Sequence, residues 1–243
     1  MNNIGTCNIA GRLGHWANEK PDSPAIVEIS SGKQKTFKEL ENESSLLASG
    51  LIRSGMKPGN RVLLMVPYGI DFVILAFAMF KAGLVSVLID PGLGKINVLK
   101  CIKQIQPQGM IAISLAHAIR KLLPTTFKSI EHNVTIGKRW FWGGTTLRQL
   151  QDSRQTGFKM PVIKEEDAAA ILFTSGSTGP AKGVLYTHGI FNHQVRVLQE
   201  QFDIQDDEID LPTFPLFGLF SSCLLYTSPS PRDATLSRKA SKA

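Results

Sequence analysis

Apolar residues along this chain alternate between short unbroken runs and longer stretches with helical spacing. The short runs predict buried strands at residues 25–29, 62–66, 84–89, 110–113, 134–136 and 168–173. The helical spacing predicts helices at residues 8–19, 37–54, 70–82, 95–105, 116–123 and 189–201. Strands that alternate with helices predict βαβ units. We therefore expect an α/β fold with mostly parallel sheets and helices on both faces.

Two of the helical stretches carry more specific signals. Thr36 is followed three residues later by Glu39, which is the capping-box pattern at the start of a helix, and Gly55 is expected to end that helix. Residues 72–80 form the longest apolar run, nine residues between Asp71 and Lys81. That run is too short to cross a membrane, so it predicts a helix buried on most of its sides.

Composition places the chain among globular proteins. Its 243 residues suffice for one large or two small domains, and 43% of them are hydrophobic. The N-terminus has no apolar signal core, and the three cysteines are far apart and odd in number. We therefore expect reduced thiols, a cytoplasmic location and no disulfide framework.

His188 and His193 are five residues apart, which is poor spacing for two ligands on one helical face, so no metal site is predicted.

The stretch from Ala168 to Gly189, AAAILFTSGSTGPAKGVLYTHG, combines hydroxyls, glycines and one lysine. A flexible linker is one interpretation. However, strand-like segments adjoin the tract on both sides, and Lys182 lies where hydroxyls and bare backbone amides converge. Such amides favour anions, so the tract predicts a phosphate cradle beyond the carboxyl end of a strand. It lacks the Gly-Lys-Ser/Thr ending of a Walker P-loop, which argues against an ordinary P-loop NTPase.

The segment Thr174–Gly183 resembles the phosphate-binding signature of the AMP-forming, acid-activating enzymes, which include acyl-CoA synthetases, luciferases and adenylation domains. The resemblance implies ATP with Mg²⁺, a carboxylic acid substrate, and acyl-AMP and pyrophosphate as products. It implies a catalytic role for Lys182, which would stabilise phosphate charge. The implied nucleotide-binding residues are Thr174, Ser175, Gly176, Ser177, Thr178, Gly179, Lys182 and Gly183.

A narrower resemblance covers most of the chain. Leu88-Ile-Asp-Pro-Gly92, Trp142-Gly-Gly-Thr-Thr-Leu147 and Asp210–Phe217 are among the segments that resemble the olefin-biosynthesis branch, the β-lactone synthetases. This resemblance implies a long-chain 2-alkyl-3-hydroxy acid and possible association with other enzymes of that pathway. Many CoA-forming relatives have a histidine after an aromatic residue in the segment that corresponds to Leu211–Leu216. In this chain Pro215 follows Phe214 instead. A fatty acyl-CoA ligase and a degenerate, non-enzymatic nucleotide-binding module remain alternatives.

The end of the chain departs from the family pattern. Residues 1–220 are expected to form a partial N-terminal AMP-binding domain that is inactive by itself, whereas residues 221–243 resemble a non-native or disordered tail. Prolines at 229 and 231 argue against any helix or strand in that tail. The tail carries four Lys/Arg and one Asp, so without it the net charge falls from +7 to +4. This basicity is therefore no evidence for a nucleic-acid partner.

The segment Arg139–Thr145 places two tryptophans beside two glycines. One interpretation is a wall of a substrate or nucleotide site. The interpretation we favour is a surface loop that packs on the domain through its aromatic side chains.

Overall fold

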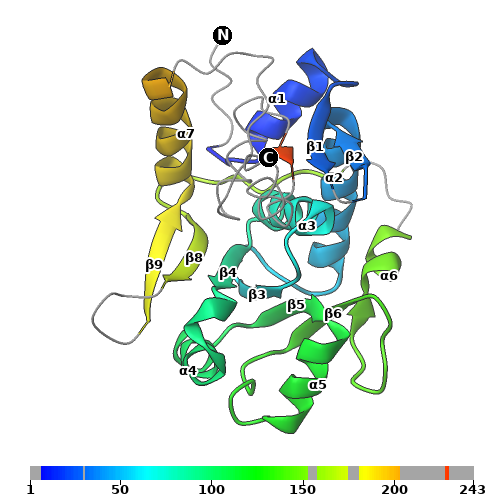
Figure 1. Ribbon diagram of the computed structural model, residues 1–243, viewed down its shortest axis with the longest axis vertical. Helices are drawn as coiled ribbons and strands as arrows, with labels where there is room; N and C mark the ends of the chain where they lie inside the picture. Colours follow the sequence, from blue (N-terminus) through cyan, green and yellow to red (C-terminus); the bar gives the residue numbers. More distant parts are fainter. Residues whose placement is uncertain (1–6, 30, 153–157, 175–180, 203–227, 230–243) are drawn as a thin grey trace, which may run out of the picture.

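The computed structural model describes residues 7–29, 31–152, 158–174, 181–202 and 228–229. Within these ranges a seven-stranded sheet has the order β7-β6-β5-β3-β4-β8-β9 (Figure 1). Its strands are β3 (Arg61–Met65), β4 (Val85–Ile89), β5 (Gly109–Ile113), β6 (His132–Ile136), β7 (Thr145–Thr146), β8 (Ala168–Thr174) and β9 (Lys182–Thr187). Neighbouring strands are parallel except for β8 and β9, which are antiparallel. The predicted, mostly parallel α/β fold is confirmed.

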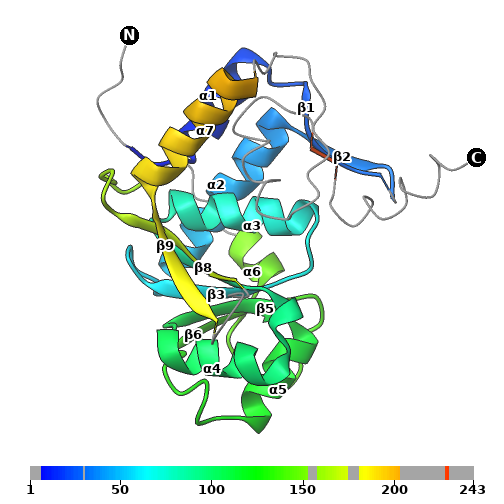
Figure 2. The same cartoon turned by 60° about the vertical axis from the view of Figure 1, so that its left-hand side comes forward.

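Helices cover both faces of this sheet. Helices α2 (Phe37–Arg53) and α3 (Ile70–Lys81) lie on one face, and α4 (Lys95–Ile105) and α5 (Ser114–Leu122) lie on the other (Figures 1 and 2). The other helices in the part of the chain that the structure describes are α1 (Gly11–Glu19), η1 (Pro91–Leu93), α6 (Leu147–Gln151) and α7 (His188–Phe202). Successive residues of β3 point to opposite faces, so Val62 and Leu64 join one core cluster and Leu63 the other.

The two specific helix signals are confirmed. The Thr36 hydroxyl accepts a hydrogen bond from the Glu39 amide at 3.2 Å, and the Thr36 amide donates to the Glu39 carboxylate at 2.9 Å. Every residue from Phe72 to Lys81 in α3 is buried. Across the described ranges, no helix combines the length and apolar character that a membrane crossing requires.

The structure differs from the sequence prediction at the start of the first helix and at one strand. Asn8 was expected inside the first helix, but α1 begins at Gly11. The Asn8 side chain instead accepts from the Ala10 amide at 3.0 Å and donates to the Phe80 carbonyl at 2.6 Å, which anchors the chain before the helix. Strand β2 (Lys33–Thr36), which pairs antiparallel with β1 (Pro24–Glu28), was not predicted because its residues KQKT show no apolar alternation.

The expectation that no strand passes through residues 228–231 was wrong for two residues. Ser228 and Pro229 form β10, which runs parallel to β1 at the edge of a small three-stranded sheet. An edge strand tolerates proline because its missing N–H can face away from the ladder. The other residues of 221–243 lie outside the described ranges.

Gly50 allows α2 to approach α6 closely. A Cβ atom at residue 50 would lie 2.7 Å from the Leu150 carbonyl oxygen and 2.9 Å from the Leu150 Cβ. Gly50→Ala is therefore expected to destabilise the fold by about 1–3 kcal/mol, the usual cost of overpacking a core. The measurement is the shift of the thermal or denaturant unfolding transition.

Gly11→Ala is the matched control for this prediction. Gly11 is also helical, but a Cβ there meets no atom within 4 Å. Its substitution should leave stability unchanged or raise it by up to about 1 kcal/mol, because alanine favours helix. Equal effects of the two substitutions would contradict the packing argument.

Candidate active site

The glycine tract joins two antiparallel strands. Thr174, the last residue of β8, is the direct Cα partner of Lys182, the first residue of β9. The tract therefore follows the carboxyl end of β8, as the sequence predicted. The predicted site residues Ser175, Gly176, Ser177, Thr178 and Gly179 lie outside the described residues. The structure therefore brings Thr174, Lys182 and Gly183 together and fixes where the tract begins and ends.

The carboxyl ends of the parallel strands meet at this same edge of the sheet, where ligands bind in open α/β folds. Ile89 of β4 is the Cα partner of Phe173, so Asp90 lies next to the start of the tract. Asp90 is exposed, and one of its carboxylate oxygens accepts from the Gly92 amide at 2.8 Å. Its carboxylate is thereby held near the carboxyl end of β8, where the tract begins.

Tyr68 lies on the β3–α3 connection at the same edge. Burial is the main cause that raises the pKa of the Tyr68 hydroxyl above its ordinary value, and the negative charge of Asp90 adds to it. At neutral pH this hydroxyl is protonated and can donate a hydrogen bond. Sequence reasoning did not assign a role to Tyr68 or Asp90. Asp90 could have been found, because it immediately follows a predicted strand.

Gly183 and Lys182 differ in their surroundings. Gly183 faces Phe173 across the β8–β9 pair, and a Cβ at residue 183 would come within 2.9 Å of the Phe173 ring. This glycine therefore has a packing role that the sequence did not predict. Lys182 is exposed at the start of β9, so its ammonium group is accessible to an anion near the tract.

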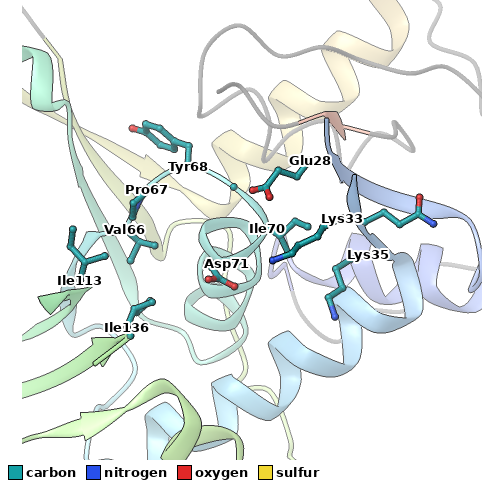
Figure 3. A pocket seen from close by; sticks show the side chains of 13 residues that line it. Glu28, Lys33, Lys35, Val66, Pro67, Tyr68, Ile70, Asp71, Ile113 and Ile136 are labelled. Atoms are coloured by element: carbon teal, nitrogen blue, oxygen red, sulfur yellow. The ribbon is translucent and has the colours of Figure 1, made fainter. Parts of the chain in front are cut away.

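Two hollows open at the carboxyl edge. The larger, of about 680 Å³, lies between the β1–β2 hairpin and the β3–α3 connection. In Figure 3, Glu28 and Lys33 of the hairpin and Asp71 of α3 project into it, so its hairpin side carries charges of both signs. The smaller, of about 380 Å³, is lined almost wholly by apolar side chains, among them Leu64, Leu88 and Ile119.

His188 lies at the start of α7 and is fully buried. Its Nδ1 accepts a hydrogen bond from the Ile9 amide at 3.2 Å, so the neutral ring carries its proton on Nε2. The ring also meets Phe80 edge-on, with centroids 6.0 Å apart. Burial lowers the pKa of His188 to about 4, against a smaller opposing effect of Asp167. These contacts tie the N-terminal segment to α7 and indicate a structural histidine.

This buried histidine predicts a loss of stability in acid. Between pH 6.5 and about 4 the unfolded chain binds a proton at His188 that the folded chain does not, so the free energy of unfolding falls as pH decreases. The loss attributable to His188 should reach at most about 3 kcal/mol. His188→Asn keeps an acceptor for Ile9 and should flatten that part of the pH profile, measured by denaturant unfolding. An unchanged acid slope in the variant would contradict the assignment.

The segment Arg139–Thr145 packs on the domain through Trp142, but Trp140 and Phe141 are 55% and 78% exposed, so the expected aromatic packing holds only in part. The Trp142 ring is buried, stacks on His117 with centroids 5.7 Å apart, and donates through Nε1 to the Thr135 hydroxyl at 2.9 Å. Among the described residues, no group of three or more His, Cys, Asp or Glu side chains is arranged to hold a metal ion.

The sequence of this chain matches a known protein family and several curated proteins. A family model described as AMP-binding enzyme matches residues 13–228. The chain is 41% identical over 236 residues to an olefin β-lactone synthetase of Xanthomonas campestris, covering 93% of this chain and 42% of that protein. It is 29% identical over 248 residues to a long-chain-fatty-acid–CoA ligase of Haemophilus influenzae, covering 86% of this chain and 43% of that protein. The chain thus spans less than half the length of these relatives.

Solved structures show the same fold at low identity. The crystal structure of an anthranilate CoA ligase in complex with anthranoyl-AMP matches with a TM-score of 0.83 at 17% identity, covering 96% of this chain and 46% of that one. A long-chain-fatty-acid–CoA ligase from Archaeoglobus fulgidus matches with a TM-score of 0.80 at 21% identity, covering 92% and 46%.

Proposed function

Because the chain belongs to the AMP-binding enzyme family, we propose that the longer protein activates a carboxylic acid with ATP. The substrate carboxylate attacks the α-phosphorus, the bond to the β-phosphate oxygen breaks, and acyl-AMP and pyrophosphate form. The observation that carries the proposal is the Ser/Thr/Gly tract at the carboxyl end of β8, with Lys182 opposite Thr174 at its base. Fixed amides, hydroxyls and a cation at this point would stabilise charge on the departing pyrophosphate.

Mg²⁺ is the expected companion of ATP in this proposal. In sites of this kind the ion is held by one or two carboxylates together with the substrate phosphates. The exposed carboxylate of Asp90 beside the tract fits such a contact. When bound, the ion would neutralise phosphate charge. The residues of this chain would bind and orient the nucleotide through the tract from Thr174 to Gly183.

We further propose a 2-alkyl-3-hydroxy acid with long alkyl chains as the substrate. The 3-hydroxyl oxygen would attack the activated acyl carbon, lose its proton and displace AMP, which closes a four-membered β-lactone. The support is the 41% and 40% identity to two proteins named olefin β-lactone synthetase, against 29% for the CoA ligase. A cytoplasmic location and association with other enzymes of olefin biosynthesis belong to the same proposal.

A long-chain fatty acyl-CoA ligase is the alternative supported by a specific observation, the match to the Haemophilus influenzae ligase. Product analysis separates the two. The full-length protein, incubated with ATP, Mg²⁺ and a long-chain 2-alkyl-3-hydroxy acid, should yield a β-lactone without CoA. Formation of an acyl-CoA thioester from a simple fatty acid, with no lactone from the hydroxy acid, would favour the ligase. A protein that binds ATP but turns over neither acid would be a nucleotide-binding module.

The chain spans 42% of the Xanthomonas relative, so these proposals concern the longer protein. We propose that the 243 residues alone do not adenylate an acid. Acid-dependent AMP formation by the 243-residue chain would contradict this.

A further inference from the structure

The layer formed by α4 and α5 is strongly basic. Between Pro91 and Ile130 the chain has six Lys/Arg residues and no Asp or Glu. Five of these cations are exposed, namely Lys95, Lys100, Lys103, Lys121 and Lys128. In both ribbon views α4 and α5 lie together at the lower end of the molecule (Figures 1 and 2). The positive charge is therefore concentrated on one side of the fold and does not depend on the tail.

The same layer exposes large aliphatic side chains. Leu115 and Leu122 of α5 are 64% and 79% exposed, and Ile119 between them is 40% exposed. Their spacing of four and three residues places all three on one stripe of the helix. On α4, Ile96 is 72% exposed. Single exposed apolar residues are common on protein surfaces, but an exposed apolar stripe within a layer that also carries exposed cations indicates an interaction surface.

An aromatic loop, residues 137–141, adjoins α5. Trp140 and Phe141 are 55% and 78% exposed, and both rings contact the buried Trp142, with centroids 5.3 and 5.5 Å away. The loop is held against α5 because the Ser114 hydroxyl donates to the Lys138 carbonyl. Lys138 and the neighbouring Arg139 are exposed and add two cations. Two large aromatic side chains are thus presented to solvent beside the basic layer.

We propose that α4, α5 and the loop 137–141, which together we call the basic apolar face, dock on an anionic lipid bilayer. Cations attract the headgroups of anionic lipids, while leucine, isoleucine, tryptophan and phenylalanine side chains enter the boundary between headgroups and acyl chains. A nucleic acid would use the cations but would leave the aliphatic stripe of α5 in water. Leu115 and Ile119 also line the apolar hollow of about 380 Å³, so the stripe continues into an apolar opening of the protein. This inference does not depend on the proposed function.

Vesicle flotation tests the proposal, because vesicles rise in a density gradient and aggregated protein does not. The 243-residue chain is mixed with vesicles of phosphatidylcholine and phosphatidylglycerol, and separately with phosphatidylcholine alone. We expect flotation with the anionic vesicles, little with the neutral ones, and a decrease at high salt because screening weakens the attraction. Absence of flotation with anionic vesicles at low salt would overturn the proposal.

Two double variants test the two components of the surface. Lys100→Gln with Lys121→Gln should weaken partitioning roughly tenfold or more, because each cation near an anionic surface contributes about fivefold. Leu115→Ser with Leu122→Ser should weaken it by about tenfold, even on anionic vesicles, because the buried apolar area is lost. The matched control is Lys159→Gln with Val162→Ser. Both control residues are exposed and lie outside the basic apolar face, and Val162 is 80% exposed, close to Leu122.

Unfolding transitions of all variants should match the parent, since every substituted side chain is exposed. If the double variants float like the parent, or the control loses as much binding as they do, the proposal is wrong. A duplex DNA that binds the chain while anionic vesicles do not would identify a nucleic-acid surface instead. Self-association that the leucine variant abolishes, without any vesicle binding, would identify an interface between copies.

Discussion

Replacing Lys182 with alanine in the full-length enzyme is expected to lower the adenylation rate by roughly tenfold to a thousandfold, the effect of removing one preorganised electrostatic stabiliser. Lys182 is exposed at the first position of β9, and its Cα pairs with that of Thr174 at the base of the tract. Its ammonium group is therefore placed to meet charge that develops on pyrophosphate. Acid-dependent exchange of labelled pyrophosphate into ATP measures the rate.

Two matched variants separate this role from a general effect of charge. Lys182→Arg retains the cation and should recover part of the rate. Lys159→Ala removes an exposed lysine from the connection before β8 and should leave the rate unchanged. If Lys182→Ala adenylates as fast as the parent, Lys182 is not a phosphate contact.

Replacing Lys81 with methionine is expected to have the largest effect on stability. Lys81 is fully buried, and its ammonium nitrogen lies 2.7 Å from a carboxylate oxygen of Glu41. It also donates to the Glu41 carbonyl at 2.9 Å and to the Ser45 hydroxyl at 2.8 Å, which joins α3 to α2. Removal of Lys81 leaves the Glu41 carboxylate, which is 26% exposed, without its ion-pair partner. We therefore expect a loss of about 3 kcal/mol in denaturant unfolding, the lower end of the range for breaking a buried pair.

The double variant with Glu41→Gln is the control for this effect. It removes the unpaired carboxylate, so it should be more stable than Lys81→Met alone. A single variant as stable as the parent, or a double variant less stable than the single one, would contradict the role of the pair.

The same lysine predicts a change of stability in alkali. Burial lowers the pKa of Lys81 to about 8, against the opposing effect of Glu41. Between pH 8 and about 10.5 the unfolded chain binds a proton at Lys81 that the folded chain has released, so the free energy of unfolding rises with pH. The rise should be at most about 3 kcal/mol and should be absent in Lys81→Met.

The parallel core could be predicted because its signals are local and unambiguous. The apolar runs of β3, β4, β5 and β8 fill a sheet covered on both faces, and the Thr36–Glu39 capping box sets the start of α2. The position of the tract at the carboxyl end of β8 followed from the same pattern.

Features that depend on distant contacts could not be predicted. The apolar pattern suggested that the first helix starts at Asn8, but a hydrogen bond from Asn8 to Phe80, 72 residues away, keeps Asn8 outside it. Lys81 ends an apolar helix and would be expected in water, yet Glu41 and Ser45 of another helix allow its burial. The place of Tyr68 and Asp90 at one edge of the sheet depends on the order of strands in the sheet, which no local pattern encodes.

The identity of the nucleotide product tests the central claim most directly. The full-length protein is incubated with ATP, Mg²⁺ and a long-chain 2-alkyl-3-hydroxy acid, and the nucleotides and phosphates are separated and quantified. We predict that AMP and pyrophosphate appear in equal amounts, only when the acid is present. Release of ADP and orthophosphate, or nucleotide turnover that does not depend on the acid, would contradict the proposed acid activation.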